Sequence, residues 1–221
     1  MFIKSAQAKL LSVAVASALA LGASTAYATQ SEGGFSIGVK GGYKDIDIPT
    51  SSLSGSIDGK TLSLSSKIDK YVGNIHAGYL WPVADVFQLG GQVGYSYYGQ
   101  YKLTGTFDGA SASIKTTYSS VNLEVVGQWN IQSWFVQLRA GGGYFMQNAS
   151  DSGAFGNTDH SRDNKWAPIA GVSGGYFFTD NFSGEVFYDH VFGTNYNSTS
   201  VLSADKPATM NMVGVGLTYS F

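Results

Sequence analysis

The sequence of 221 residues predicts an all-β protein, an eight-stranded antiparallel up-and-down transmembrane β-barrel preceded by a cleaved signal peptide. Three observations lead to this prediction. They are a short apolar segment behind two lysines at the N-terminus, a series of alternating apolar and small polar segments, and an alternating segment that ends on an aromatic residue. Alternation with a period of two places one kind of residue on each face of an extended strand.

The N-terminal segment is typical of a secretory signal peptide. Lys4 and Lys9 precede an apolar run over residues 10–21, and the small-x-small tripeptide of residues 26–28 follows. The run of about a dozen residues is shorter than the roughly 20 that a membrane-spanning helix needs. We therefore expect removal of residues 1–28, with residues 29–221 forming one outer-membrane β-barrel domain.

Eight later segments alternate between apolar and polar or small residues. Their apolar series span residues 35–43, 71–81, 87–97, 121–129, 134–144, 170–178, 182–190 and 213–221. The apolar side is expected to face lipid, because a Lys or Arg facing lipid at mid-membrane costs about 2–4 kcal/mol. Rings near both ends of these series predict two aromatic girdles. A soluble barrel or sandwich also alternates, but the girdled rings favour the membrane-spanning form.

The connections alternate in length. Residues 82–85, 130–133 and 179–181 form short connections, whereas residues 44–70, 99–113, 147–164 and 193–209 form long polar ones. Short turns on one side and long loops on the other are typical of an outer-membrane barrel with both termini in the periplasm.

The composition limits the partners that can be expected. The chain has 13 Lys and Arg against 15 Asp and Glu, a weakly acidic balance that gives no reason to expect nucleic acid as a partner. It has no cysteine, so strand pairing and packing must supply its stability. No cofactor and no metal site are expected.

The last strand carries a further pattern. It places five apolar residues on one face, namely Val213, Val215, Leu217, Tyr219 and Phe221. This pattern resembles the C-terminal signal of bacterial outer-membrane proteins, and the resemblance implies the barrel-assembly machinery as a partner. Residues 29–221 as a whole resemble the small barrels of the OmpA transmembrane domain and OmpX type. That resemblance implies a location in the outer membrane and contact with lipid and lipopolysaccharide. The sequence departs from OmpA in that no peptidoglycan-binding domain is expected after the last strand, so a role in anchoring the cell wall is not carried over.

The inward positions carry charges. Five charged residues have inward parity, namely Lys40, Glu124, Arg139, Glu185 and Asp189. If residues 131–132 form a two-residue turn, Glu124 and Arg139 lie directly opposite each other. The interior of an eight-stranded barrel is just wide enough for side chains to fill it, so a structural plug is favoured over a gate.

Two long connections contain Asp-Gly, a strong signal for a tight hairpin. The predicted tips are Asp58-Gly59 and Asp108-Gly109, at the ends of two ribbons beyond the membrane. The outward-facing residues of the paired strands are odd-numbered, whereas an Asp-Gly tip pairs odd-numbered with even-numbered residues. Each ribbon must therefore contain a one-residue shift in its register, such as a β-bulge, and we expect these shifts at Pro49 and at Gly99. Unpaired ribbon edges could contact a host surface or matrix ligand. Shielding of the barrel from lipopolysaccharide is the alternative.

The third connection, residues 148–164, contains Asp151, Asp159, His160 and Asp163 among small polar residues, and a flexible polar loop is expected there rather than a calcium loop.

The serine that would act as nucleophile in a lipid A deacylase is absent from the sequence at the expected position. Small barrels that deacylate lipid A carry a His-x-Ser pair, and the nearest counterpart here is His190, with Phe192 in place of the serine. We therefore expect a non-enzymatic protein that serves envelope structure, surface adhesion or both. A narrow channel for ions or small solutes and, third, a lipid A-modifying enzyme are the alternatives.

Overall fold

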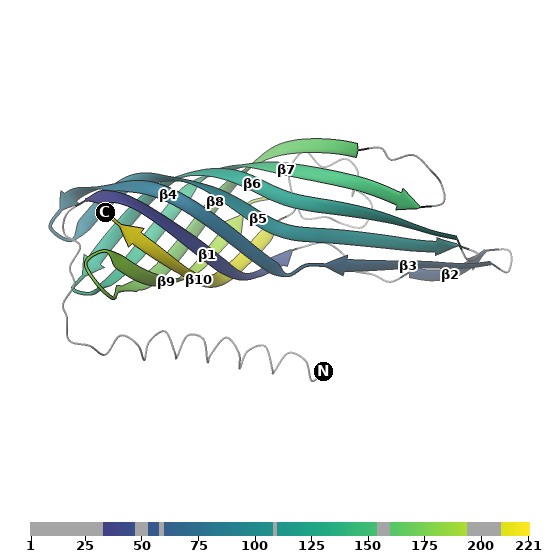
Figure 1. Ribbon diagram of the computed structural model, residues 1–221, viewed down its shortest axis with the longest axis horizontal. Helices are drawn as coiled ribbons and strands as arrows, with labels where there is room; N and C mark the ends of the chain where they lie inside the picture. Colours follow the sequence, from purple (N-terminus) through teal and green to yellow (C-terminus); the bar gives the residue numbers. More distant parts are fainter. Residues whose placement is uncertain (1–32, 47–52, 58–59, 108–109, 154–159, 194–208) are drawn as a thin grey trace, which may run out of the picture.

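Eight strands of the computed structural model close into an antiparallel barrel (Figure 1). The structure describes residues 33–46, 53–57, 60–107, 110–153, 160–193 and 209–221. The predicted signal peptide, Pro49 and both Asp-Gly tips lie outside the described residues. The described part of the chain contains no helix long and apolar enough to cross a membrane.

Each barrel strand pairs with the barrel strands that precede and follow it along the chain. The strands are β1 (Gly34–Ile46), β4 (Tyr71–Ala84), β5 (Phe87–Phe107), β6 (Ala110–Ile131), β7 (Trp134–Gly153), β8 (His160–Phe177), β9 (Phe182–Val191) and β10 (Met210–Ser220). The first strand, β1, pairs with β4 on one side and with the last strand, β10, on the other, which closes the barrel. The predicted eight-stranded fold is therefore confirmed.

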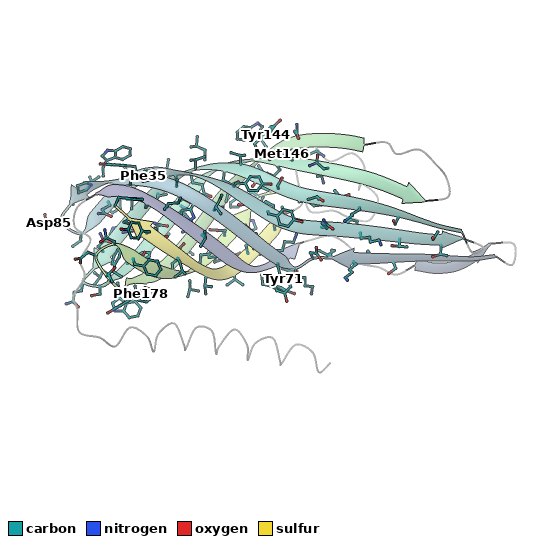
Figure 2. The ribbon with its side chains drawn as sticks, in the orientation of Figure 1. Phe35, Tyr71, Asp85, Tyr144, Met146 and Phe178 are labelled. Atoms are coloured by element: carbon teal, nitrogen blue, oxygen red, sulfur yellow. The ribbon has the colours of Figure 1, made fainter. Side chains whose placement is uncertain are left out.

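The predicted alternation of faces is confirmed as well. Leu123 is 68% exposed on the outer surface, whereas the adjacent Glu124 is 8% exposed and lies in the lumen. Rings gather near the short turns, where Trp81, Trp129 and Trp134 are exposed. Figure 2 shows Phe35 and Phe178 toward this end, where Asp85 also lies, and Tyr71 and Tyr144 at the other end of the barrel, near the middle of the molecule. The apolar outer surface between these rings is the part that meets lipid.

Beyond the barrel, four strands continue as a flat extension. β5, β6, β7 and the first part of β8 run past the other strands, and a hairpin of β2 (Leu53–Ile57) and β3 (Lys60–Ile68) lies beside them (Figure 1). β3 pairs with β5, so the two ribbons predicted from the sequence are joined into one sheet. The expectation that each ribbon has unpaired edges is therefore wrong for β3 and β5. Among the described strands of the hairpin, β2 keeps an edge without a partner.

Gly99 forms the predicted irregularity in the second ribbon. The register between β5 and β6 shifts by one residue between Tyr97 and Gln100, and Gly99 has a φ of 76°. Glycine adopts a positive φ without the steric cost that a Cβ atom imposes. The shift reverses the parity of β5, so even-numbered residues face outward beyond Gly99. Phe107 pairs with Ala110, the register that the Asp-Gly tip requires.

The described residues at both ends of the third connection are strand rather than flexible loop, and residues 154–159 lie outside the described residues. β7 continues to Gly153 and β8 begins at His160, and the register pairs Ser150 with His160. The polar composition suggested a loop, but paired backbone groups on the extension hold these residues in the sheet.

The turn between β6 and β7 also differs from the prediction. It consists of Gln132 and Ser133, with Gln132 at a φ of 56°, rather than of residues 131–132. Ile131 instead pairs with Trp134, and both side chains are exposed on the lipid-facing surface. A β-branched residue is disfavoured at a turn position with positive φ, which accounts for the difference.

Candidate functional site

The turn shift changes the partners of the lumen charges. Glu124 pairs in register with Gly141, and Arg139 pairs with Val126, so Glu124 and Arg139 are not opposite each other as expected. Arg139, which is 3% exposed, instead lies 2.7 Å from Asp189 and 3.5 Å from Glu185. Lys40 lies 3.1 Å from Glu185. Four of the five predicted lumen charges thus form one connected ion-pair network.

Both acidic members of the network come from one strand. Glu185 and Asp189 lie four positions apart on β9, so both point into the lumen. Arg139 also donates hydrogen bonds to Gln137 Oε1 at 2.7 Å and to Ser173 Oγ at 2.9 Å. Because breaking a buried ion pair from one side leaves an uncompensated charge, this network constrains the relative positions of three strands, β1, β7 and β9.

Two glycines make room for these pairs. Gly171 lies in register between Arg139 and Asp189, and Gly216 lies in register between Lys40 and Glu185. A Cβ atom on Gly171 would collide with Asp189 Oδ1, and one on Gly216 would lie 2.9 Å from Glu185 Oε1. The ion pairs therefore join strands that are not adjacent, over a middle strand without a side chain.

Glu124 is the fifth charge, and it is held differently. Its Oε2 atom accepts a hydrogen bond from the side-chain amide of Gln92. No ion pair of Glu124 with another described residue is present. Glu124 therefore lines the lumen beside the network as a hydrogen-bonded carboxylate.

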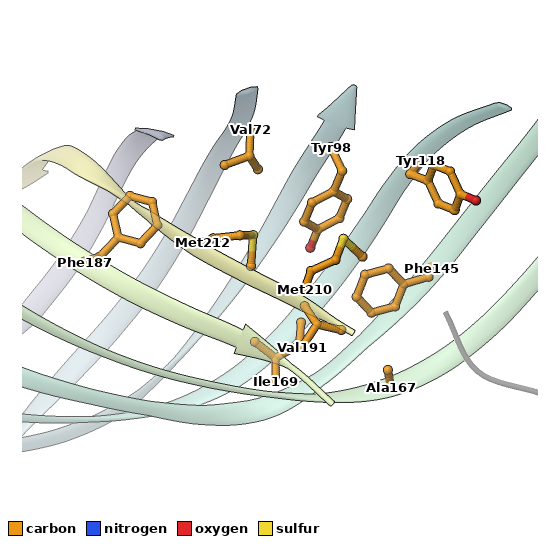
Figure 3. Packing of buried hydrophobic residues seen from close by; sticks show 10 residues of the cluster. All are labelled: Val72, Tyr98, Tyr118, Phe145, Ala167, Ile169, Phe187, Val191, Met210 and Met212. Carbon is orange, nitrogen blue, oxygen red and sulfur yellow. The ribbon is translucent and has the colours of Figure 1, made fainter. Parts of the chain in front are cut away.

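An apolar cluster fills the lumen toward the extension. Ten buried residues from every barrel strand except β1 converge there (Figure 3), namely Val72, Tyr98, Tyr118, Phe145, Ala167, Ile169, Phe187, Val191, Met210 and Met212. The rings of Tyr98 and Phe145 stack with their centroids 5.6 Å apart. The Tyr98 hydroxyl lies 2.9 Å from Ser120 Oγ, which satisfies its one polar group. We call this cluster the apolar plug.

The apolar plug is not among the features predicted from the sequence, which concern the charges and amides at inward positions. The signal was present, because Phe145, Phe187 and Met212 have inward parity in otherwise polar or small series.

The opposite half of the lumen is filled by amides and a pair of rings. Gln128 donates to Gln88 Oε1 at 3.2 Å and accepts from Gln137 at 3.1 Å. Phe135 and Phe177 pack with ring centroids 5.0 Å apart near the short turns. His76 is buried among these groups, and its Nδ1 lies 3.1 Å from Asn74 Oδ1.

Two small cavities lie in the lumen, one on each side of the charges. The first, of about 20 Å³, is lined by Glu124, Asp189 and members of the apolar plug. The second, of about 40 Å³, is lined by His76, Glu185 and the ring pair Phe135 and Phe177. The first has room for one or two water molecules and the second for about three, because a water needs about 10–15 Å³ of such space. The described lumen is therefore filled by side chains.

The other predicted site residues are the hairpin tips and the apolar series of the last strand, β10. The hairpin tips themselves are outside the described residues, but Ile57 pairs with Lys60 on either side of the first tip. At the short-turn end, Phe221 donates from its backbone N–H to the Phe35 carbonyl at 2.9 Å, and its ring lies 5.0 Å from that of Tyr219. Of the residues in the predicted assembly signal, Val215, Leu217, Tyr219 and Phe221 are exposed on the lipid-facing surface and Val213 is half-buried there.

His190 is engaged in local contacts. Its Nδ1 atom lies 2.7 Å from Asn211 Oδ1, and its ring contacts that of Phe192 edge-on, with centroids 4.4 Å apart. The described residues contain no group of three or more His, Cys, Asp and Glu side chains able to hold a metal ion.

One basic residue at the base of the extension has a shifted pKa. Lys70 lies between β3 and β4, with its Nζ 5.5 Å from the centroid of the Tyr43 ring. A hydrogen bond with the Tyr43 side chain raises the pKa of Lys70. Lys70 is therefore a cation at the boundary between barrel and extension.

The closed antiparallel barrel, its apolar outer surface and its ringed ends define an outer-membrane β-barrel of the small eight-stranded type, with the fold of the OmpA transmembrane domain and OmpX. The attachment invasion locus protein Ail of Yersinia pestis is similar to this chain, with a TM-score of 0.51 and 15% identity, over 87% of this chain and 99% of Ail. The N-terminal barrel domain of OprF from Pseudomonas aeruginosa matches with a TM-score of 0.42 and 16% identity, over 86% of this chain and 100% of that domain.

The outer membrane protease OmpT of Escherichia coli matches with a TM-score of 0.43 and 11% identity, over 90% of this chain and 99% of OmpT. No protein-family model matches the chain, and no curated protein matches its sequence. At these identities the similarity extends to the fold and not to the activity.

Proposed function

We propose that this chain is a non-enzymatic outer-membrane protein whose extended sheet serves surface attachment, while the filled barrel anchors that sheet in the membrane. The observation that carries the proposal is the joined extension of β2, β3, β5, β6, β7 and the first part of β8. A sheet of six paired strands presents a broad and stiff surface, unlike a set of separate loops. Both termini are assigned to the periplasm, because the short turns and Phe221 lie at the end opposite the extension.

The edge of β2 is the part of the extension best suited to a partner strand. Its unpaired backbone groups can add a strand from another protein, and main-chain hydrogen bonds then supply the affinity. The similarity in fold to a protein named for attachment and invasion agrees with this use, but the proposal rests on the extension.

The test compares cells of a non-adherent laboratory strain that display the full chain or trimmed chains. Register-preserving trimming removes residues 104–107 with 110–113, and residues 54–57 with 60–63, so that Leu103 remains opposite Ile114 and Leu53 opposite Leu64. Attachment to host cells and matrix proteins is scored. We expect attachment with the full chain and its loss in the trimmed chain.

Surface display is measured in parallel, by protease protection of the barrel and by heat-dependent gel mobility. A trimmed chain that is displayed and still attaches would overturn the assignment to the extension. A full chain that is displayed and does not attach would leave envelope structure, with the extension as a shield, as the function.

A narrow channel is the second candidate, and the filled lumen argues against it. The two cavities lie on either side of the ion-pair network, and the first is lined by members of the apolar plug and the second by the ring pair of Phe135 and Phe177. Conduction would require several buried side chains to move together, at the energetic cost of exposing packed apolar groups.

The non-enzymatic assignment rests on the surroundings of His190. A histidine that activates a hydroxyl needs that hydroxyl within hydrogen-bonding distance, and His190 contacts the Asn211 amide and the Phe192 ring instead. Expression in a host whose lipid A mass is recorded tests this assignment, because a change in mass would show a lipid-modifying activity.

The barrel-assembly machinery is proposed as the partner of the β10 strand during insertion. Deletion of Phe221 should lower the amount of barrel in the outer membrane of cells and leave refolding in detergent micelles nearly unchanged. Equal losses in both settings would assign Phe221 to stability, through its contacts with Phe35 and Tyr219, rather than to recognition.

A further inference from the structure

Three lysines form a row across the base of the extension. Lys67 of β3 lies opposite Lys102 of β5, and Lys102 lies opposite Lys115 of β6. Side chains directly opposite each other on neighbouring antiparallel strands have Cβ atoms about 4.5–5.5 Å apart, and like charges at such positions destabilise the sheet. The row is therefore a feature that an anionic ligand would stabilise.

All three lysines point to the outer face of the sheet. Tyr101 packs against the apolar plug, so the adjacent Lys102 points away from the lumen. Tyr118 belongs to the plug, and Lys115, three positions before it, has the opposite parity. Lys67, Lys102 and Lys115 are all exposed. The row thus continues the surface that faces lipid lower down the barrel.

The row lies a short distance beyond the outer aromatic residues. Tyr97, on the same face of β5, is 42% exposed, and Lys102 follows it after the bulge at Gly99. Five residues of strand cover about 15 Å, and a strand tilt of about 40° reduces this to a height of roughly 12 Å. Lysine side chains reach several further ångströms toward a polar interface, so the ammonium groups can lie at the level of lipid head groups.

The lysines surround an open hollow of about 290 Å³, which is also lined by Asp69, Gln100 and Ser113. This volume is near the lower end of ligand sites, roughly 300 Å³. Asp69 is the carboxylate in this lining, and its Oδ2 accepts a hydrogen bond from the Gln100 backbone N–H at 3.2 Å. No ion pair joins the three lysines to another residue in the described part of the chain. Three cations against one carboxylate leave the hollow positively charged.

We propose that the row of Lys67, Lys102 and Lys115 binds the phosphate groups of lipopolysaccharide in the outer leaflet. The row crosses the strands at the base of the extension rather than running up along them, and it continues the face that meets lipid, at the level of the head groups. A soluble polyanion would have no need of this face, whereas a phosphorylated glycolipid is held beside it by the membrane. Each lysine near an anionic lipid surface contributes a factor of about five in affinity.

The test titrates the refolded mature chain in dodecyl maltoside micelles with rough lipopolysaccharide, with the same lipid after dephosphorylation, and with heparin as a soluble polyanion. One variant combines Lys67→Gln, Lys102→Gln and Lys115→Gln, and a second changes all three lysines to Arg. Lys165→Gln is the matched control, because Lys165 pairs in register with Phe145 of the apolar plug and therefore shares the inner face of the sheet.

The triple Gln variant should bind phosphorylated lipid on the order of 100-fold more weakly than the unmodified chain, whereas the Arg variant and Lys165→Gln should bind within a factor of about two. Dephosphorylated lipid should bind all four proteins equally weakly. Heat-dependent gel mobility reports folding, and if the triple variant does not fold, Lys102→Gln alone should weaken binding about fivefold.

Two results would overturn the proposal. One is equal affinity of the unmodified and triple Gln chains for phosphorylated lipid. The other is a combination of two observations: heparin binding depends on the three lysines, and the unmodified chain binds phosphorylated and dephosphorylated lipid equally well. That combination would assign the row to a soluble polyanion. Neither result bears on the attachment assay, so the two proposals fail independently.

Discussion

Arg139 of β7 and Asp189 of β9 meet at 2.7 Å over Gly171 of β8, the strand that separates theirs. The absence of a side chain at Gly171 is what allows two residues from non-adjacent strands to touch. The same arrangement joins Lys40 and Glu185 over Gly216.

Gly171→Ala should lower the free energy of unfolding by about 3 kcal/mol, because the new Cβ displaces the Asp189 carboxylate and leaves a buried charge with a poorer partner. Denaturant unfolding in detergent micelles measures the change. Gly174→Ala is the matched control on the same strand, since its Cβ would have no neighbour nearer than 3.9 Å. Similar losses in both variants would show that strand propensity, rather than the ion pair, explains the effect.

Arg139→Met and Glu124→Gln should differ strongly. Arg139→Met leaves Asp189 and one side of Glu185 without a cation and should cost about 3–5 kcal/mol, whereas Glu124→Gln should cost less than about 1 kcal/mol because Glu124 is hydrogen-bonded rather than ion-paired. Unfolding of the two variants under the same conditions tests the ranking. Equal costs would restore a direct role for Glu124 in the network.

The refolded barrel should show no discrete conductance steps in planar lipid bilayers. The apolar plug and the ion-pair network close the lumen on both sides of cavities of about 20 and 40 Å³. Stable open levels whose ion selectivity changes on Glu124→Gln would contradict this expectation and favour the channel.

Gly99→Ala should loosen the extension and leave the barrel intact. The alanine would have to adopt the φ of 76° that Gly99 has, and its Cβ atom would lie 2.8 Å from the Asp69 Cβ. An Ala in this left-handed region costs roughly 1–2 kcal/mol. The substitution should therefore speed hydrogen exchange of the amides in the extension beyond Gly99 and leave the exchange of the barrel amides unchanged. Gly73→Ala, at a position where a Cβ would meet nothing within 4 Å, should change neither.

The sequence predicted the barrel because lipid imposes a strict rule on every second residue. Parity even located the shift at Gly99, since an Asp-Gly tip and two alternating strands can be reconciled only by an extra residue. These inferences depend on local patterns and on integer register. Neither inference required knowledge of contacts between strands that are not adjacent in the sheet.

The partners of the lumen charges could not be obtained in that way. A turn displaced by one residue, at Gln132 and Ser133, moved Arg139 away from Glu124. Its actual partners lie two strands away, where contact depends on the tilt of the strands and on Gly171. The joining of β3 to β5 was missed for a related reason, because local composition indicates a hairpin but not the neighbour on which that hairpin lies.

The Lys40–Glu185 pair crosses the seam where the first and last barrel strands meet. Lys40 lies on β1 and Glu185 on β9, and β10 must be in place between them before they can meet over Gly216. The neutralisation of Lys40 by Glu185 is thus coupled to ring closure, so a chain that stalls as an open sheet keeps that positive charge without its acidic partner. The ion pair inside the lumen therefore stabilises the closed barrel relative to an open sheet.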